Sequence, residues 1–354
     1  MTSAQLTMPE VPTGWSASVP DLPDVPEIAA LLAAHQRAAH GSSSVDPEMV
    51  ESNVAGTGSW TRREVIVRDP DGALAAWGLV HDRAAGRTVV EVTVRPDEEH
   101  ADEVAKALFD WAADVARTIT HARGLTETQL DSGAYAADDR QRRWLADAGY
   151  SQARTWLQMS RPVTPADADL PGPRAGVTVR RVATHEDGTP VAADLQAVHL
   201  VLEESFADHF NSYRESFPEF MQRLREDPGH RWALWWLAEV EDEAGEPAPG
   251  GAVVGTVLPP DDSGAYGSYI DYIGVHRRSR GRGVAKALLH TVIRDALEHD
   301  RNRVGLEVDA DSPTGADGLY SSMGWVTSYK TESWHRDLRW SASRRSAATL
   351  SRRR

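Results

Sequence analysis

Residues 269–290 read YIDYIGVHRRSRGRGVAKALLH, and this stretch decides the fold of the second half of the chain. The apolar residues before Val275 predict a buried strand, and those from Val284 onward recur at helical spacing. Between them lies a loop of arginines and glycines. Glycines let successive backbone N–H groups point at one position, and a helix N-terminus adds a partial positive charge. The order of strand, glycine loop and helix therefore predicts a site for an anion such as a pyrophosphate.

The loop resembles that of the GNAT N-acetyltransferases, which carry Q/R-x-x-G-x-G/A at the start of a helix that follows a strand. Residues 280–285, RGRGVA, fit this pattern with the family's usual spacing from the strand, and 278–283, RSRGRG, fit it in a second register. Residues 318–325, GLYSSMGW, are similar to the family's helix with a tyrosine four positions before a glycine. Neither G-x-G-x-x-G nor G-K-[ST] occurs in the loop, which disfavours Rossmann and P-loop sites. The alternative interpretation is a turn that only joins a strand to a solvated helix.

The resemblance implies that acetyl-CoA is the acyl donor and that the loop and the end of the strand bind it. The backbone near the end of the strand would pair with the pantetheine arm as an added strand does. The arginines, Lys286 and the loop amides would hold the phosphates. The implied donor-binding residues are Gly274, Val275, His276, Arg277, Arg280, Gly281, Arg282, Gly283, Val284, Ala285 and Lys286.

Direct transfer to an amine needs a base for the amine and an acid for the departing thiolate. Asp271 is the predicted base. The alternation of a strand places it on the same face as Tyr269. The tandem layout of the chain resembles that of mycothiol synthase, which has a glutamate on this face, at the position of Tyr269. An exposed or arginine-paired aspartate is the alternative interpretation, and Glu307 is an alternative base. Tyr320 matches the family tyrosine, whose hydroxyl would protonate the thiolate; the alternative is a core aromatic residue.

The acceptor side is predicted from the segment after the first helix of the second half. Glu203 and His209 lie in this segment, and with Tyr269 they are the predicted substrate-binding residues for a cationic amine. A surface role for His209 is the alternative. The tryptophans at 232, 235 and 236 are expected to fill the core. No histidine spacing typical of a metal site occurs, so we expect no metal.

The length of 354 residues predicts two domains. We expect an α/β (α+β) fold of two tandem GNAT domains, each a mixed, largely antiparallel sheet flanked by helices. The predicted boundaries are an N-terminal domain 1–162, a linker 163–176 rich in Pro, Gly and Asp, a C-terminal catalytic domain 177–338 and an Arg-rich tail 339–354. Helices are expected at 28–39, 101–122 and 191–206, strands at 64–67, 73–80, 88–94, 177–182, 232–240, 251–258 and 304–308, and further elements at 125–130, 138–148 and 151–161. Two unrelated α/β domains are the alternative to a duplication.

The first half differs from the second where the donor would bind. Its loop, VRPDEEHADEV at 94–104, has no glycine and five acidic residues, and Leu145 stands four positions before Gly149, where the second half has its tyrosine. Carboxylates repel phosphates, although acidic residues also suit a helix N-terminus. We interpret the first half as a degenerate GNAT domain.

Composition limits the function classes. The net charge of −15 disfavours binding to nucleic acid or an anionic membrane. The chain has no cysteine, which excludes disulfides, cysteine zinc sites and a thiol nucleophile. No apolar run is long enough for a membrane span and no signal peptide is recognisable, so a cytoplasmic monomer or homodimer is expected.

Together these features predict an N-acetyltransferase for a small amine. The alternatives are a non-catalytic acetyl-CoA-binding or regulatory protein and, more specifically, an enzyme similar to mycothiol synthase, whose tandem layout the chain resembles.

Overall fold

The computed structural model describes residues 7–56, 58–83, 87–206, 216–241, 245–261, 263–312 and 315–340. Its strands form one 12-stranded sheet in the order β1-β2-β3-β4-β5-β12-β6-β11-β10-β9-β8-β7. The pairs β4–β5 and β10–β11 are parallel and the other neighbours are antiparallel. The strands are β1 (Ser16–Ser18), β2 (Arg62–Arg68), β3 (Leu74–Asp82), β4 (Arg87–Val94), β5 (Glu127–Tyr135), β6 (Ser151–Pro162), β7 (Val177–Arg181), β8 (His230–Glu241), β9 (Pro247–Leu258), β10 (Gly267–Val275), β11 (Arg303–Asp309) and β12 (Val326–Arg339).

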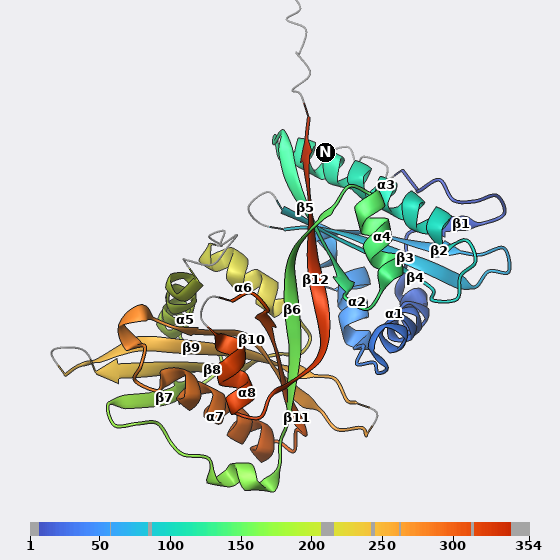
Figure 1. The fold of residues 1–354 in the computed structure, drawn as a ribbon. Helices are drawn as coiled ribbons and strands as arrows, with labels where there is room; N and C mark the ends of the chain where they lie inside the picture. The colour runs from blue at the N-terminus through green and yellow to red at the C-terminus, as the bar shows by residue number, and fades with distance from the viewer. Residues whose placement is uncertain are drawn as a thin grey trace, which may run out of the picture.

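Helices pack on both faces of this sheet (Figure 1). They are α1 (Val25–His40), α2 (Pro47–Ala55), α3 (Ala101–Ala122), α4 (Asp139–Asp147), α5 (Ala192–Phe206), α6 (Phe217–Arg225), α7 (Val284–Glu298) and α8 (Ala316–Ser322). In the N-terminal half, α3 and α4 share one core with the sheet and α1 and α2 share another. In the C-terminal half the corresponding cores are those of α7 with α8 and of α5 with α6.

The strand β8 shows why the central strands are apolar at successive positions. Trp235 and Leu237 belong to the core under α5 and α6, whereas Trp236 and Ala238 belong to the core under α7 and α8. Alternate side chains of a strand point to opposite faces, so both sets are buried. Trp235 and Trp236 fill the core, as the sequence predicted.

The order of the sheet supports an internal duplication. Strands β1–β5 run in order from one edge of the sheet toward its centre, and β7–β11 run in the same order from the other edge. Each strand of the first half thus corresponds to the strand numbered six higher. The same correspondence relates α1–α4 to α5–α8, because each set contributes two helices to each face. Two unrelated domains would have no reason to produce this symmetry.

The two halves exchange their last strands. β6, from the first half, pairs with β11 of the second half, and β12, the last strand of the chain, pairs with β5 of the first half. β6 and β12 also pair with each other and run side by side between the halves (Figure 1). The predicted boundaries at 162 and 177 coincide with the end of β6 and the start of β7. The assignment of these ranges as separate domains remains a proposal, because each half contributes a strand to the sheet of the other.

Most expected elements lie within a few residues of their predicted positions, and α3 matches 101–122. β12 and α6 were not predicted, and neither were α2 and the short β1. The predicted linker contains a short 3-10 helix, Pro165–Asp169.

In the described residues, no helix is long and apolar enough to span a membrane. Most of the Arg-rich tail lies outside the described residues.

Candidate active site

The parallel strands β10 and β11 separate at their carboxyl ends. Their pairing runs from Ser268 with Val304 to Ile270 with Leu306, yet the strands continue to Val275 and Asp309. Over residues 272–275, β10 stays paired with β9 on its other side. The separation leaves one backbone edge of β10 facing a cleft, where an extended ligand segment can add as a strand does.

A cavity of about 1160 Å³ occupies this cleft. Its walls come from β10, β11, α5, α6, α8 and the start of α7, and also from β4 and β6 of the N-terminal half and from β12. The predicted site residues that line it are Asp271, Gly274, Val275, Arg280, Gly281, Gly283, Val284, Ala285, Lys286, Tyr320 and Glu203.

The loop before α7 has the backbone that a phosphate cradle needs. Gly281 and Gly283 have φ of +76° and +85°, in the left-handed region that favours glycine. A Cβ at Gly283 would meet the Arg174 side chain at 3.0 Å, whereas a Cβ at Gly281 would meet nothing within 4 Å. Arg280, Lys286 and Arg174 bring positive charge to the cavity wall at this end. Arg174 lies in the predicted linker, and no pattern in the sequence identified it.

Three predicted donor-binding residues lie outside the cavity lining. Arg282 donates from Nη1 to the carbonyl of Glu241 at 2.8 Å. His276 lies 2.8 Å from the carboxylate of Glu204 and caps the short helix that includes Arg277. Their part in donor binding stays a prediction.

Asp271 occupies a β-bulge. Ile270 pairs with Gly255 and Tyr272 with Val254, which leaves Asp271 as an extra residue between them. The period-2 alternation assumed from the sequence is therefore interrupted here, and Tyr272 rather than Asp271 holds the regular position on the α5–α6 face. A bulge can aim a side chain in a direction that regular pairing forbids.

The carboxyl group of Asp271 is poised to accept a proton near neutral pH. Its Oδ2 atom is buried and has no hydrogen-bond partner among the described residues. Burial raises the pKa of Asp271 to about 7; the nearby carboxylate of Asp227 adds to the increase, and a hydrogen bond with Thr256 and the charge of Arg223 oppose it. Arg223 also lies over the ring of Tyr272, 5.4 Å from its centroid.

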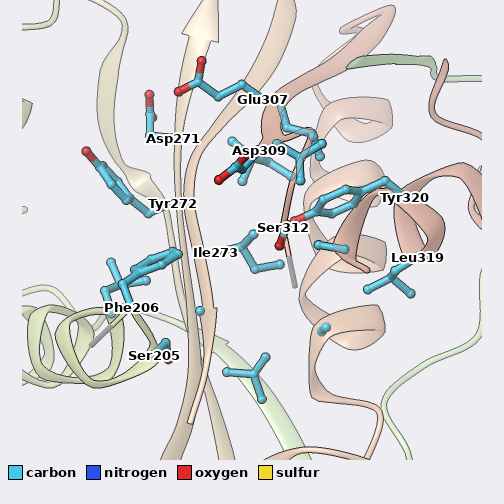
Figure 2. Close-up of a pocket in the computed structure, with 18 of the residues that line it drawn as sticks. Ser205, Phe206, Asp271, Tyr272, Ile273, Glu307, Asp309, Ser312, Leu319 and Tyr320 are labelled. Atoms are coloured by element: carbon cyan, nitrogen blue, oxygen red, sulfur yellow. The ribbon is translucent and has the colours of Figure 1, made fainter. Parts of the chain in front are cut away.

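Tyr320 lines the same cavity as Asp271. Its side chain comes from α8 and its hydroxyl is directed toward Ser312 (Figure 2). The residue is 7% exposed, and its ring packs edge-on against Trp325 with centroids 6.0 Å apart. Burial raises the pKa of Tyr320 to about 12, so the hydroxyl keeps its proton at neutral pH.

Two further carboxylates stand on β11. Glu307 extends beside Asp271 at the same end of the cleft (Figure 2) and accepts a hydrogen bond from Gln158 Nε2 at 2.9 Å. Asp309 lies 3.6 Å from Nε of Arg154. Both carboxylates line the cavity.

The predicted acceptor residues have different positions. Glu203 lines the cavity from α5. Tyr269 does not line it; its ring lies against Gly305, and burial, with the charges of Glu307 and Asp271, raises its pKa. His209 lies outside the described residues.

In the N-terminal half the equivalent cleft is filled by the protein itself. β4 and β5 also separate, after Val89 and Asp131. Gln141 of α4, which is buried, donates to the carbonyl of Val92 at 3.2 Å. Arg140 donates to the carbonyl of Pro96 at 2.7 Å, with longer contacts to the carbonyls of Arg95 and Val94. These acceptors belong to the end of β4 and the two residues after it, the edge that a pantetheine arm would need.

The C-terminal half has small residues at the equivalent positions. Counted back from Gly149 and Gly324, which end α4 and α8 with the same backbone hydrogen bonds, Gln141 corresponds to Ala316 and Arg140 to Gly315. Both small residues line the cavity. The difference in side-chain size keeps one cleft open and the other closed.

The comparisons with known proteins agree with this geometry. Residues 198–325 match the model of the acetyltransferase (GNAT) family. The match covers most of the C-terminal half. A GCN5-related N-acetyltransferase from Sphaerobacter thermophilus is 25% identical, with a TM-score of 0.73 over 94% of this chain and 98% of that one. Comparison with curated proteins gives no significant match.

Two more distant structures share the fold. A tandem GNAT protein from the clavulanic acid biosynthesis pathway is 14% identical, with a TM-score of 0.65 over 91% of this chain and 98% of that one. The N-myristoyltransferase of Saccharomyces cerevisiae, solved with myristoyl-CoA, is 11% identical, with a TM-score of 0.57 over 94% and 80%. The whole chain has the tandem GNAT fold.

Sequence reasoning missed one wall of the cavity. Arg87, Arg154 and Trp156 come from β4 and β6, and Ser333 and His335 come from β12. These residues carry no motif, and the exchanged strands that bring them to β11 are a property of the assembled sheet.

Proposed function

We propose that the protein is an acetyl-CoA-dependent N-acetyltransferase that acts on a small amine, with its active site in the C-terminal half. One observation carries this proposal: the cleft between β10 and β11 has the glycine cradle at one end and Asp271 and Tyr320 on its two sides. Residues 198–325 match the model of the acetyltransferase (GNAT) family, which supports the same reaction class.

The residues suit direct transfer. The edge of β10 at Gly274 and Val275 binds the pantetheine arm, and the cradle with Arg280 and Lys286 binds the phosphates. The amine nitrogen attacks the thioester carbonyl carbon, and Asp271 takes the proton that the nitrogen loses. The carbon–sulfur bond then breaks, and Tyr320 gives its proton to the thiolate. The products are the acetylated amine and CoA.

The N-terminal half supports the site without a donor of its own. Gln141 and Arg140 occupy the edge of β4, and Glu98 in its loop is held by Arg95 at 2.6 Å. We therefore expect one acetyl-CoA per chain.

Calorimetry and a turnover assay test the proposal. The parent protein should bind one acetyl-CoA and release CoA with at least one member of a panel of amines. Gly283→Glu should abolish binding, because the residue would be strained at φ +85° and would add a negative charge to the cradle. Gly245→Glu has a similar φ of +82° outside the cavity and is the matched control, with unchanged binding.

Two results would contradict the proposal. If the Gly283→Glu variant bound acetyl-CoA with the parent's affinity, the glycine loop would not be part of the binding site. Tight binding without turnover on any amine would favour the alternative, a non-catalytic acetyl-CoA-binding protein. The orphaned carboxyl oxygen of Asp271 favours the enzyme, because a binding protein has no need of it.

A further inference from the structure

The far wall of the cavity differs chemically from the cleft. At the cleft, Asp271 and Glu307 provide carboxyl groups. On the wall built from the N-terminal half, Arg87 of β4 and Arg154 of β6 provide guanidinium groups, beside His335 and Ser333 of β12. Where an amine would react, the cavity therefore has two carboxyl groups with Arg223 nearby, and on the opposite wall it has two guanidinium groups with Asp309 beside Arg154.

Each of the two arginines is held in position by an aspartate that contacts its Nε atom. Asp131 accepts from Nε of Arg87 at 2.6 Å, and its other carboxylate oxygen accepts from Gln129 at 2.7 Å. Arg87 lines the cavity, whereas Asp131 does not. Asp309 lies 3.6 Å from Nε of Arg154. Their side chains are 20% and 27% exposed, which means that both are partly desolvated yet accessible.

The strand register indicates how far Arg154 lies from Asp271. Asp309 of β11 pairs with Trp156 of β6, and Arg154 stands two residues beyond Trp156. β6 is two strands from β10, so the strand that carries Arg154 lies roughly 10 Å from Asp271 across the sheet, before any offset along the strands; Arg87 on β4 is three strands farther. A guanidinium fork matches a carboxylate or phosphate geometrically.

We propose that the acceptor is an amine that also carries an anionic group, and that Arg87 and Arg154 bind this group while the amine lies at Asp271. This inference rests on the proposed function and deepens it. It gives the N-terminal half a role in selecting the acceptor, although we expect that half to bind no donor. Burial lowers the pKa of His335, which favours its neutral form.

A matched series of amines tests the proposal. The compounds are 4-aminobutanoate, 6-aminohexanoate and 8-aminooctanoate, each with the monoamine and the diamine of similar length, and an aminoalkyl phosphonate to separate phosphate-like from carboxylate recognition. With saturating acetyl-CoA, kcat/KM should be highest for an amine of the carboxylate or phosphonate set. Equal or better turnover of the monoamine or diamine at every length would overturn the proposal while leaving the acetyltransferase activity in place.

Variants locate the effect. Arg154→Gln and Arg87→Gln should each lower kcat/KM for the preferred anionic amine about 10- to 100-fold, the usual effect of losing a hydrogen bond to a charged group, with little change for the monoamine. Arg154→Glu should shift the preference toward the diamine. Arg87→Lys keeps a positive charge near Asp131 and is the control that separates loss of the guanidinium group from misfolding. Arg339→Gln is the matched control, because Arg339 on β12 also meets an acid through Nε, 3.2 Å from Glu127, but does not line the cavity.

Binding measurements decide the case in which no amine reacts. Calorimetry of the same compounds with the protein saturated by CoA should then show the anionic amines bound more tightly than their counterparts, and the two arginine variants should lose this difference. Equal binding would refute the inference. Failure of acetyl-CoA itself to bind would instead refute the proposed function.

Discussion

Asp271 shows how one residue obtains its chemistry from its surroundings. The bulge turns the carboxyl group into a partly buried position and leaves Oδ2 without a partner, and burial brings its pKa to about 7. We expect kcat/KM for the acceptor to rise with pH through about 7 in the parent. Asp271→Asn should remove this inflection and lower the rate most above pH 7, where the parent residue is ionised. A pH–rate profile that keeps the same inflection in the variant would exclude Asp271 as the base.

The same substitution has a stability consequence with a definite sign. An ordinary Asp has a pKa of 3.8, and Asp271 has one of about 7 in the folded protein, so the folded state binds the proton more tightly. The parent therefore loses stability as the pH rises from about 4 to about 7. Asp271→Asn should unfold at a higher temperature than the parent at pH 8 and show little advantage near pH 4. This result would confirm that the Asn variant is folded when its rate is measured.

Tyr320 supplies the second prediction at this scale. Tyr320→Phe removes the hydroxyl but keeps the ring against Trp325, so the fold and the affinity for acetyl-CoA should be unchanged. Turnover should fall by about 10²- to 10⁴-fold, the usual contribution of a general acid. Single-turnover kinetics with the phenylalanine variant measure this loss. Full turnover would assign Tyr320 to the core and leave protonation of the thiolate to another group.

At the scale of elements, α4 and α8 are equivalent helices whose first turns differ. α4 fills the cleft of the first half with Gln141, and α8 leaves the second cleft open with Ala316. We expect Ala316→Gln to weaken acetyl-CoA binding roughly 10- to 100-fold, because a side-chain amide would compete for backbone hydrogen bonds worth about 1 kcal/mol each. Calorimetry with Ala316→Ser as the control measures the loss. Unchanged affinity would mean that the donor does not use this part of β10.

At the scale of the molecule, the exchanged strands should hold the two halves together without a covalent link. A protease site inserted beside Gly172, where added atoms meet nothing within 4 Å, allows the folded chain to be cut between β6 and β7. The fragments should co-elute in gel filtration and separate only on denaturation, because β6 pairs with β11 and β12 pairs with β5. Separation under native conditions would show that the halves associate weakly.

The sequence by itself determined the glycine loop before α7. Gly281, Gly283 and the apolar residues of α7 are local signals, because left-handed backbone and helical periodicity depend on neighbouring residues. The same locality explains why α3 and most strands were predicted, and why the acidic loop of the first half was recognised. Tyr320 and Asp271 were named from the resemblance, and both line the cavity.

The tertiary structure alone decided the rest. The bulge at Asp271 depends on pairing with β9, and the filled cleft of the first half depends on α4 reaching β4. Arg154 reaches the cavity because the last strands are exchanged, which places β6 beside β11, and Arg87 of β4 lines the same cavity. Pairing between distant strands leaves no local pattern, since either neighbour would satisfy the same apolar alternation. The sequence therefore located the glycine loop that we propose binds the donor, and the assembled sheet located the wall that we propose selects the acceptor.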